Sequence, residues 1–275
     1  MILFFAPGGR TGNLLFQLAF IESIRKPSEW LIATQLKGIH KKFSGFRRIV
    51  STDSRLFIKI VDHLLYPLII HVFVKTNIFS SYLENKKGEL VYQKGLLPIT
   101  LIGGFFQGPQ YFDENKLKFR LRGHYYSRPN KLLSNIGSQK PIFVHIRRTD
   151  YANFKIDGNS EVMLPFGYYE KSLQFFKPFE HFHFFIVGDD PDWANEQFEF
   201  LPFKTISTLN PLEDLALMTL CEGGIISNSS FAWWGAFFSK KSLPIIAPLY
   251  WFGWKTQSWS TKTIFYEKYR YISVD

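Results

Sequence analysis

Short apolar runs alternate along this chain with stretches whose apolar residues recur at helical spacing. The apolar runs have strand length and are bounded by glycine or polar residues, which predicts buried strands at 2–5, 142–144, 184–187, 224–226 and 243–247. Helices are predicted between them, at 14–24, 166–176, 214–221 and 231–238. Because strands and helices alternate throughout the second half, the pattern favours a doubly wound α/β architecture.

The boundary between two lobes is predicted from a polar, basic segment, 115–139, which contains Pro129 and Gly137 and precedes the strand 142–144. A chain of 275 residues is long enough for two lobes, each with its own core. We therefore expect an N-terminal lobe at 1–136 and a C-terminal lobe at 137–275. The fold class predicted is α/β with two Rossmann-like lobes.

Composition narrows the class of protein and of partner. Apolar residues make up 46% and charged residues 20%, as in folded globular proteins. The excess of 33 Lys and Arg over 23 Asp and Glu gives a net charge of +10, which favours nucleotides, nucleic acid or an acidic membrane surface without choosing among them. The single Cys221 excludes an internal disulfide framework, fits a reducing compartment and is predicted to be a core residue.

No membrane-spanning segment is predicted. The apolar stretch 66–74 is short, and Pro67 and His71 interrupt it, which favours a cytoplasmic chain with peripheral contact to the inner membrane face left open. Residues 36–60 are basic and contain interspersed phenylalanines. Two interpretations remain open: a surface for nucleic acid or anionic lipid, or, as we favour, a solvated helical surface whose apolar side is packed.

The stretch 141–151, PIFVHIRRTDY, organises the second half. A buried strand ends there in His145, Arg147, Arg148 and Asp150, and ligands in α/β proteins lie at the carboxyl ends of strands. Asp150 can pair with one arginine and leave the other for a phosphate, whose geometry suits the guanidinium. The alternative is a structural Arg–Asp pair with a spare surface arginine.

Two further stretches have the composition of phosphate sites. Residues 227–230, Ser-Asn-Ser-Ser, gather hydroxyls and an amide at a predicted helix N-terminus, where unsatisfied N–H groups favour an anion; an ordinary N-cap is the alternative. Residues 8–13, Gly-Gly-Arg-Thr-Gly-Asn, form a glycine-rich loop between a strand and a helix. This loop matches neither the dinucleotide fingerprint nor the P-loop, so a plain tight turn stays open.

No metal site is predicted. Asp190-Pro191-Asp192 resembles a D-x-D metal element, but Asp190 with Pro191 also fits a helix N-cap followed by a proline. The seven histidines show no zinc-binding spacing.

Taken together, these stretches resemble the α-1,2-fucosyltransferase family. The resemblance rests on residues 9–17 (G-x-x-G-N with F-Q), 104–112 (G-Y-F-Q with Y-F), 144–151 (V-H-V-R-R-G-D-Y), Tyr168-Tyr169, and 214–236 (D-x-x-x-M-x-x-C with I-S-N-S-T-F-S-W-W-G-A). Departures are Thr149 in place of Gly, Leu14-Leu15 in place of Gln and Met, and Leu18 in place of Tyr.

The resemblance implies a GT-B-type fold and inverting transfer of fucose from GDP-fucose to a galactose hydroxyl of an oligosaccharide or lipid-linked glycan. It implies no metal and no cofactor besides this co-substrate, and no nucleic acid partner. By position it suggests Arg147, Asp150 and Asn13 as catalytic, with Asp150 the candidate general base. It suggests a donor site made of Gly12, Asn13, His145, Arg147, Asp214, Asn228, Ser229, Ser230 and Phe231. Arg147, Ser229, Ser230 and the Phe231 N–H would hold the diphosphate, His145 and Asp214 the nucleoside, and Gly12 and Asn13 the fucose. The alternative function is a non-catalytic basic binding module for nucleic acid or anionic membrane.

Overall fold

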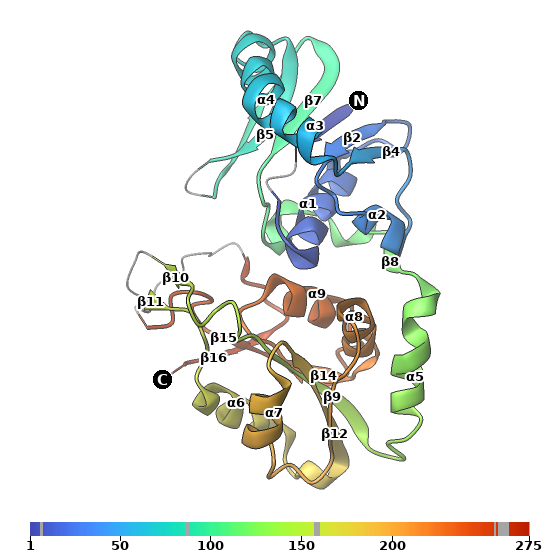
Figure 1. Cartoon of the computed structure of the whole chain (residues 1–275), viewed down its shortest axis with the longest axis vertical. Coiled ribbons are helices and arrows are strands. Elements are labelled where there is room, and N and C mark those ends of the chain that lie inside the picture. Colours follow the sequence, from blue (N-terminus) through green and yellow to red (C-terminus); the bar gives the residue numbers. More distant parts are fainter. Residues whose placement is uncertain (6–7, 86–87, 157–159, 256, 258–263, 275) are drawn as a thin grey trace. The chain divides into compact units, whose positions relative to one another are not determined.

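The computed structural model describes residues 1–5, 8–85, 88–156, 160–255, 257 and 264–274, and the chain divides into two compact units (Figure 1). The units are Met1–Arg122 and Gly123–Asp275. The predicted boundary at residue 136 is therefore too late. Residues 123–136 belong with the second unit, because Arg128 forms an ion pair with Glu213 at 2.9 Å and the Thr219 hydroxyl lies 3.4 Å from that of Tyr126.

The first unit is built on a six-stranded sheet of order β4-β2-β1-β7-β5-β6. Its strands are β1 (Ile2–Phe5), β2 (Leu31–Thr34), β4 (Ile49–Thr52), β5 (Phe79–Glu84), β6 (Leu90–Gln93) and β7 (Leu97–Gly103). All are parallel except β6, which runs antiparallel to β5 at the edge. A parallel sheet whose strands are joined by helical crossovers confirms the Rossmann-like prediction for this unit.

Helices and short elements complete the first unit. They are α1 (Thr11–Ile24), α2 (Ile39–Lys42), α3 (Arg55–Ile60), η1 (Val61–Leu65), α4 (Tyr66–Leu68), η2 (Ile69–Val74), η3 (Pro109–Tyr111), η4 (Glu114–Lys116) and the two-strand ladder β3 (Phe43–Ser44) with β8 (Arg120–Leu121). The predicted helix 14–24 begins three residues earlier, at Thr11, and most of its residues are buried.

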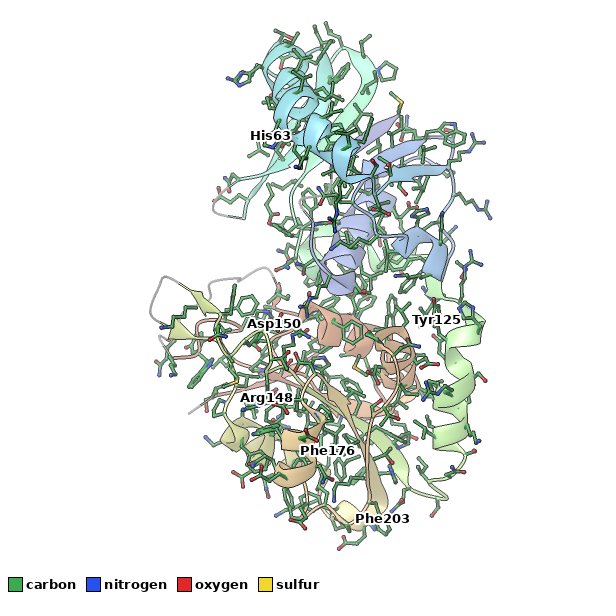
Figure 2. The ribbon with its side chains drawn as sticks, viewed as in Figure 1. His63, Tyr125, Arg148, Asp150, Phe176 and Phe203 are labelled. Atoms are coloured by element: carbon green, nitrogen blue, oxygen red, sulfur yellow. The ribbon has the colours of Figure 1, made fainter. Side chains whose placement is uncertain are left out.

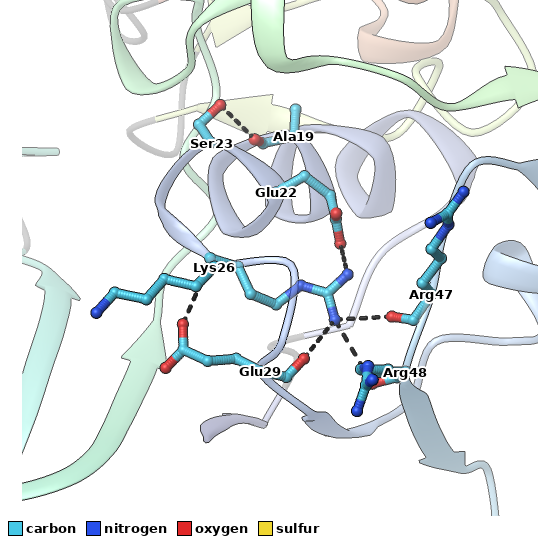
Figure 3. A network of polar contacts seen from close by, with 8 residues as sticks. Ala19, Glu22, Ser23, Lys26, Glu29, Arg47 and Arg48 are labelled. Atoms are coloured by element: carbon cyan, nitrogen blue, oxygen red, sulfur yellow. Dashed lines mark hydrogen bonds and ion pairs between the residues drawn. The ribbon is translucent and has the colours of Figure 1, made fainter.

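The end of α1 is fixed by one arginine (Figure 3). Arg25 forms an ion pair with Glu22 at 2.5 Å and donates to the Arg47 carbonyl oxygen at 2.8 Å. Its side chain also donates to the Glu29 carbonyl oxygen at 3.3 Å. Arg25 thereby ties the end of α1 to the chain before β2 and β4. Burial of Glu22 raises the pKa of its carboxyl despite this pairing.

The second unit is built on a six-stranded parallel sheet of order β13-β12-β9-β14-β15-β16. Its strands are β9 (Lys140–Ile146), β12 (Phe182–Gly188), β13 (Lys204–Ile206), β14 (Gly223–Ile225), β15 (Ile245–Pro248) and β16 (Arg270–Ile272). The strands predicted at 142–144, 184–187, 224–226 and 243–247 are therefore confirmed, within two residues at each end.

Helices and short turns follow these strands. They are η5 (Gly123–Tyr126), α5 (Ser127–Leu133), α6 (Phe166–Leu173), η6 (Gln174–Phe176), η7 (Phe179–His181), α7 (Pro191–Gln197), α8 (Pro211–Leu220) and α9 (Ser230–Phe238), with a small ladder of β10 (Lys155–Ile156) and β11 (Ser160–Glu161). One core cluster lies between the sheet and helices α6 and α7, and includes Tyr168, Tyr169 and Phe198. The Tyr168 hydroxyl donates to the Ile226 carbonyl oxygen at 2.7 Å, which anchors the chain just after β14.

Residues 36–60 do not form the single helical surface that the sequence suggested. They are divided among α2, β3, β4 and α3. Phe43 is buried, but Phe57 is 45% exposed, so the expectation of a packed apolar side is wrong at the start of α3.

The stretch 66–74 is also not an isolated short segment. It is the second half of one helical run, Arg55–Val74, which among the described residues is the one helix long and apolar enough to cross a membrane, by length and composition alone. Pro67 does not interrupt this run. It sits between two π turns, η1 and η2, and a proline's missing N–H is tolerated where the i→i−4 ladder is already rearranged.

Gly224 lies where the central strands of the second sheet leave no room for a side chain. A Cβ atom there would lie 2.3 Å from the Phe143 ring. We expect Gly224→Ala to lower the free energy of unfolding by about 1–3 kcal/mol, measured by chemical denaturation, because the buried aromatic core cannot relax freely. Gly167→Ala, in open space on α6, is the matched control and should leave stability unchanged or slightly higher. Equal stabilities of the two variants would contradict this account.

Candidate active site

Three neighbouring strands of the second sheet bring the polar segments together. Strand β9 pairs in parallel with β12 on one side and with β14 on the other. Val144 is opposite Ile186 in β12 and Ile225 in β14, so the three carboxyl ends meet at one edge. The predicted juxtaposition of the arginine segment with residues 227–230 is confirmed. This edge is where ligands bind in open α/β sheets.

Arg147 contacts two carboxylates. Its Nη2 lies 2.6 Å from Oδ2 of Asp150, and its Nη1 lies 3.0 Å from Oδ2 of Asp189. The suggestion that one arginine is left without a carboxylate is wrong. A guanidinium has five N–H donors, and these contacts use two of them. Arg147 is therefore held in place by acids while keeping donors for a further anion.

Arg148 is a structural residue of the same segment (Figure 2). Its Nε donates to Oδ2 of Asp190 at 3.2 Å, and its guanidinium lies 4.1 Å from the centre of the Trp193 ring. Its backbone N–H donates to Oδ1 of Asp189 at 2.8 Å. These contacts fix the chain between β9 and the loop after β12, which orients Arg147 beside it.

Asp189 is a residue that the sequence interpretation missed. It accepts hydrogen bonds from the Arg148 backbone and the Thr149 hydroxyl, and it forms the ion pair with Arg147. Its position directly after β12 could have indicated it, because the residues that follow adjacent parallel strands lie at the same edge of the sheet.

His145 is a buried, uncharged polar group at the end of β9. Its Nδ1 lies 2.9 Å from the Ser227 hydroxyl, and its ring centre lies 5.8 Å from that of Phe231. Burial lowers the pKa of this imidazole to about 4. Near neutral pH His145 is therefore neutral, suited to a hydrogen bond rather than to holding phosphate by charge.

The segment after β14 leads into α9. Ser229 occupies the N-cap position, yet its side chain makes no capping hydrogen bond to the described residues. The Ser229 carbonyl oxygen accepts from the Trp233 N–H at 2.9 Å. The hydroxyl of Ser229 thus does not serve as a conventional cap, and the first N–H groups of α9 point into the same edge of the sheet.

Asn228 anchors this segment. Its side-chain amide donates to the carbonyl oxygens of Val162 at 2.7 Å and Trp251 at 3.0 Å, and its backbone carbonyl oxygen accepts from the Tyr151 hydroxyl at 2.9 Å. The Asn228 side-chain amide, which was predicted to bind the donor, instead donates its hydrogen bonds to the backbone of the protein. Trp233 and Trp234 are fully buried, so this pair packs the core.

Asp214 is a buried carboxyl on α8. The Ser207 hydroxyl donates to its Oδ1 at 2.5 Å, and burial raises the pKa of the carboxyl to about 7. Helix α8 is positioned by a capping box in which Asn210 and Glu213 satisfy each other's backbone N–H groups. Asp214 can therefore accept hydrogen bonds from a ligand and change its charge near neutral pH.

The first unit carries the glycine-rich loop. Gly8 and Gly9 have φ of +90° and +114°, and a Cβ at Gly9 would lie 2.8 Å from the Asn13 side chain. The Asn13 amide oxygen accepts from the Gln107 side chain at 2.8 Å. The N-terminal and mid-chain motifs are thus joined within one unit, and Gln107 is a positioning residue that the predicted site did not include.

The Asp190 carboxylate caps the N-terminus of α7, as the N-cap alternative predicted. It accepts from the Trp193 N–H at 3.2 Å as well as from Arg148. Within the described ranges, no three His, Cys, Asp or Glu side chains gather as metal ligands would.

The comparison with known families settles the class of protein. The family model described as "Glycosyl transferase family 11" matches residues 102–273, more than half of the chain. The chain belongs to glycosyl transferase family 11. It is 30% identical over 272 residues to the "Alpha-1,2-colitosyltransferase" of Escherichia coli, covering 89% of this chain and 90% of that protein. The family resemblance inferred from the motifs is thereby confirmed.

Solved structures establish the fold of this family 11 glycosyltransferase. A family 9 glycosyltransferase from Veillonella parvula covers 90% of this chain and 80% of its own, with TM-score 0.54 and 11% identity. The NodZ α-1,6-fucosyltransferase of Bradyrhizobium, co-crystallized with GDP, covers 86% and 92%, with TM-score 0.51 and 12% identity. Both are GT-B glycosyltransferases, so the predicted GT-B fold is confirmed. The non-catalytic binding module loses its support.

Proposed function

We propose that this glycosyltransferase transfers L-fucose from GDP-fucose to a galactose hydroxyl of a glycan acceptor, forming an α-1,2 linkage with inversion. The observation that carries the proposal is the edge of the second sheet, where Arg147 and the residues 227–231 at the start of α9 converge from adjacent strands. A guanidinium and a helix N-terminus at the same edge of a sheet suit a diphosphate. The relative described as an α-1,2-colitosyltransferase supports the linkage, and NodZ with GDP supports the nucleotide.

The chemistry assigned to this edge is stabilisation of the leaving group. As the bond between the sugar and GDP breaks, negative charge grows on the β-phosphate. We assign the stabilisation of that charge to Arg147, to the hydroxyls of Ser229 and Ser230, and to the Phe231 N–H. We assign the guanine contact to Asp214, a hydrogen bond with the nucleoside to His145, and the contact with the transferred sugar to Gly12 and Asn13. The reaction proposed needs no metal.

Asp150 is assigned a positioning role rather than that of general base. Its carboxylate holds Arg147 at 2.6 Å, and taking a proton from the acceptor would weaken that ion pair during the step in which Arg147 is needed. A nucleoside diphosphate is a good leaving group, so the attacking hydroxyl needs little help from a base.

A donor test follows from this assignment. Calorimetry in EDTA should show binding of GDP and GDP-fucose, and binding of UDP-glucose at least about tenfold weaker, because a carboxylate at the base site accepts from both guanine donors. GDP binding that disappears in EDTA and returns with Mg²⁺ would contradict metal-independent binding. Equal binding of UDP-glucose would contradict the guanine assignment.

The sugar is tested separately, because the colitosyltransferase relative favours colitose as a second candidate. Colitose is fucose without its 3-hydroxyl group. Transfer from GDP-fucose should exceed transfer from GDP-colitose in an acceptor assay with terminal galactose. The reverse order would replace fucose by colitose while leaving the nucleotide assignment intact.

A further inference from the structure

The helical run Arg55–Val74 packs only one side against its own unit. Its inward residues Tyr66, Ile69, Ile70, Phe73 and Val74 join a core cluster with Phe79 and Leu101 of the sheet. Within this wholly described stretch, only Val61 and Val74 are buried. The helix is therefore attached by a narrow stripe, unlike the core helix of a globular protein.

The opposite side of the helix is apolar and exposed. Its large residues recur every four positions, with exposed fractions of 72% for Leu56, 43% for Ile60, 63% for Leu64, 47% for Leu68 and 42% for Val72. We call these five residues the outer face. A spacing of four residues is slightly more than one turn of an α-helix, and slightly less than one turn of a π-helix. Because the run alternates between α and π segments, the two deviations offset each other and the outer face stays on one side of the helix. Continuous apolar exposure of this kind marks an interaction surface.

Neighbouring strands extend the apolar surface. Leu96 is 85% exposed, and its N–H donates to the carbonyl oxygen of Asn77, just after the helix. Leu97, also exposed, donates in the same way to Ile78. The edge strand β6 adds exposed Val91, which lies opposite Leu83, a residue packed against the same core cluster. The apolar surface therefore continues beyond one helix, onto an edge that would otherwise be open to strand pairing.

The connections of the helix exclude a membrane-spanning role. The helix begins three residues after β4 and ends before β5, and both strands point the same way in one sheet. Tyr66 and Phe73 hold it against that sheet. A helix bound at both ends to one sheet cannot cross a bilayer without dismantling the sheet. It can lie in the plane of a membrane surface with one face in the acyl boundary.

Charge selects the occupant of this surface. Arg55, Lys59, Lys75 and Lys94 are exposed on or beside the helix and the β6 edge, against the exposed acids Asp53, Asp62 and Glu89. Arg47 and Arg48 are exposed just before β4, and the whole chain carries +10. A two-fold contact between copies would bring the same basic groups together, which disfavours a dimer. Anionic lipid head groups would neutralise them.

We propose that the outer face, with the basic residues beside it, docks this protein in the plane of an anionic membrane. Leu64 and Leu68 enter the acyl boundary, while Lys59 and Arg55 contact lipid phosphates. His63, labelled in Figure 2, is among the exposed polar residues of this helix. The surface lies wholly within the first unit and is independent of the proposed donor site.

The test uses the full chain and flotation with phosphatidylcholine vesicles, with or without phosphatidylglycerol. We expect binding to the anionic vesicles. The double variant Leu64→Asp with Leu68→Asp should lower the partition coefficient about tenfold or more, because two apolar anchors become charged. Lys59→Glu should lower it about fivefold and reduce its salt dependence. Phe203→Asp is the matched control, since Phe203 is also 42% exposed but belongs to the second unit, and it should bind like the parent.

Circular dichroism and GDP calorimetry on the same variants show whether they fold and whether the donor site persists. Equal vesicle binding by the double variant and the parent would overturn the proposal. So would binding to neutral vesicles that Lys59→Glu leaves unchanged. A dimer in sedimentation that the double variant dissociates, without vesicle binding by the parent, would assign the surface to a second copy instead.

Discussion

Arg147→Ala is expected to lower the rate of sugar transfer about 10²–10³-fold, with a much smaller loss of GDP affinity. In the proposed mechanism Arg147 faces the position where charge develops on departing GDP, and removing one such preorganised donor costs a factor of this size. The interaction strengthens as the bond breaks, so the loss should fall mainly on kcat. Single-turnover transfer and GDP calorimetry measure the two quantities separately.

Loss of leaving-group stabilisation must be distinguished from local disruption of the site, because Arg147 also holds Asp150 and Asp189. Arg147→Lys keeps the charge but loses the planar fork, and should recover only part of the rate. Guanidinium added at low concentration should restore some activity to Arg147→Ala but none to Arg148→Ala, whose arginine lies against Trp193. Full transfer activity in folded Arg147→Ala would refute the leaving-group assignment.

The second unit could be predicted well because its signals are local and agree with its topology. Short apolar runs followed by charge or by Ser-Asn-Ser-Ser mark strand ends, and parallel pairing then brings those ends together. The order of strands was not needed to expect the arginines near residues 227–230. The same reasoning would have placed Asp189 there, had the residues after β12 been considered as carboxyl partners.

The individual ion pairs could not be predicted from spacing. Asp150 is close in sequence to both arginines, but alternation along the chain sends Arg147 toward Asp150 and Asp189, and Arg148 toward Asp190 and Trp193. Which side chain points where depends on the backbone after β9, which no periodicity describes.

The helix Arg55–Val74 shows a different limit of sequence reasoning. Pro67 and His71 argued for a short, interrupted segment, whereas π turns on both sides of α4 carry the helix through. A helix that is apolar on several sides is ordinarily buried. Its exposure follows from tertiary structure, because the sheet beneath it covers only one stripe.

The second large effect concerns Asp214, whose pKa is raised to about 7 by burial. Guanine presents two N–H donors to a carboxylate, and hydrogen bonds to the ionised form favour it, so GDP should lower the pKa of Asp214. GDP binding should therefore release a proton below pH 7 and weaken as the pH falls. The affinity should drop about tenfold per pH unit, or about a hundredfold between pH 7 and pH 5, and level off above pH 7.

The GDP phosphates also titrate in this range, and Asp214→Asn separates the two contributions. Asparagine keeps the shape but cannot ionise, and its amide presents a donor toward guanine, so GDP affinity at pH 8 should fall about 10- to 100-fold. The pH dependence left in Asp214→Asn then belongs to the phosphates. The difference between the two proteins should follow a single proton with a midpoint near pH 7. Calorimetry in buffers of different ionisation enthalpy counts that proton directly. Identical pH profiles for parent and Asp214→Asn would remove Asp214 from the guanine site, and proton uptake on binding would mean that the carboxyl binds its ligand in the neutral form.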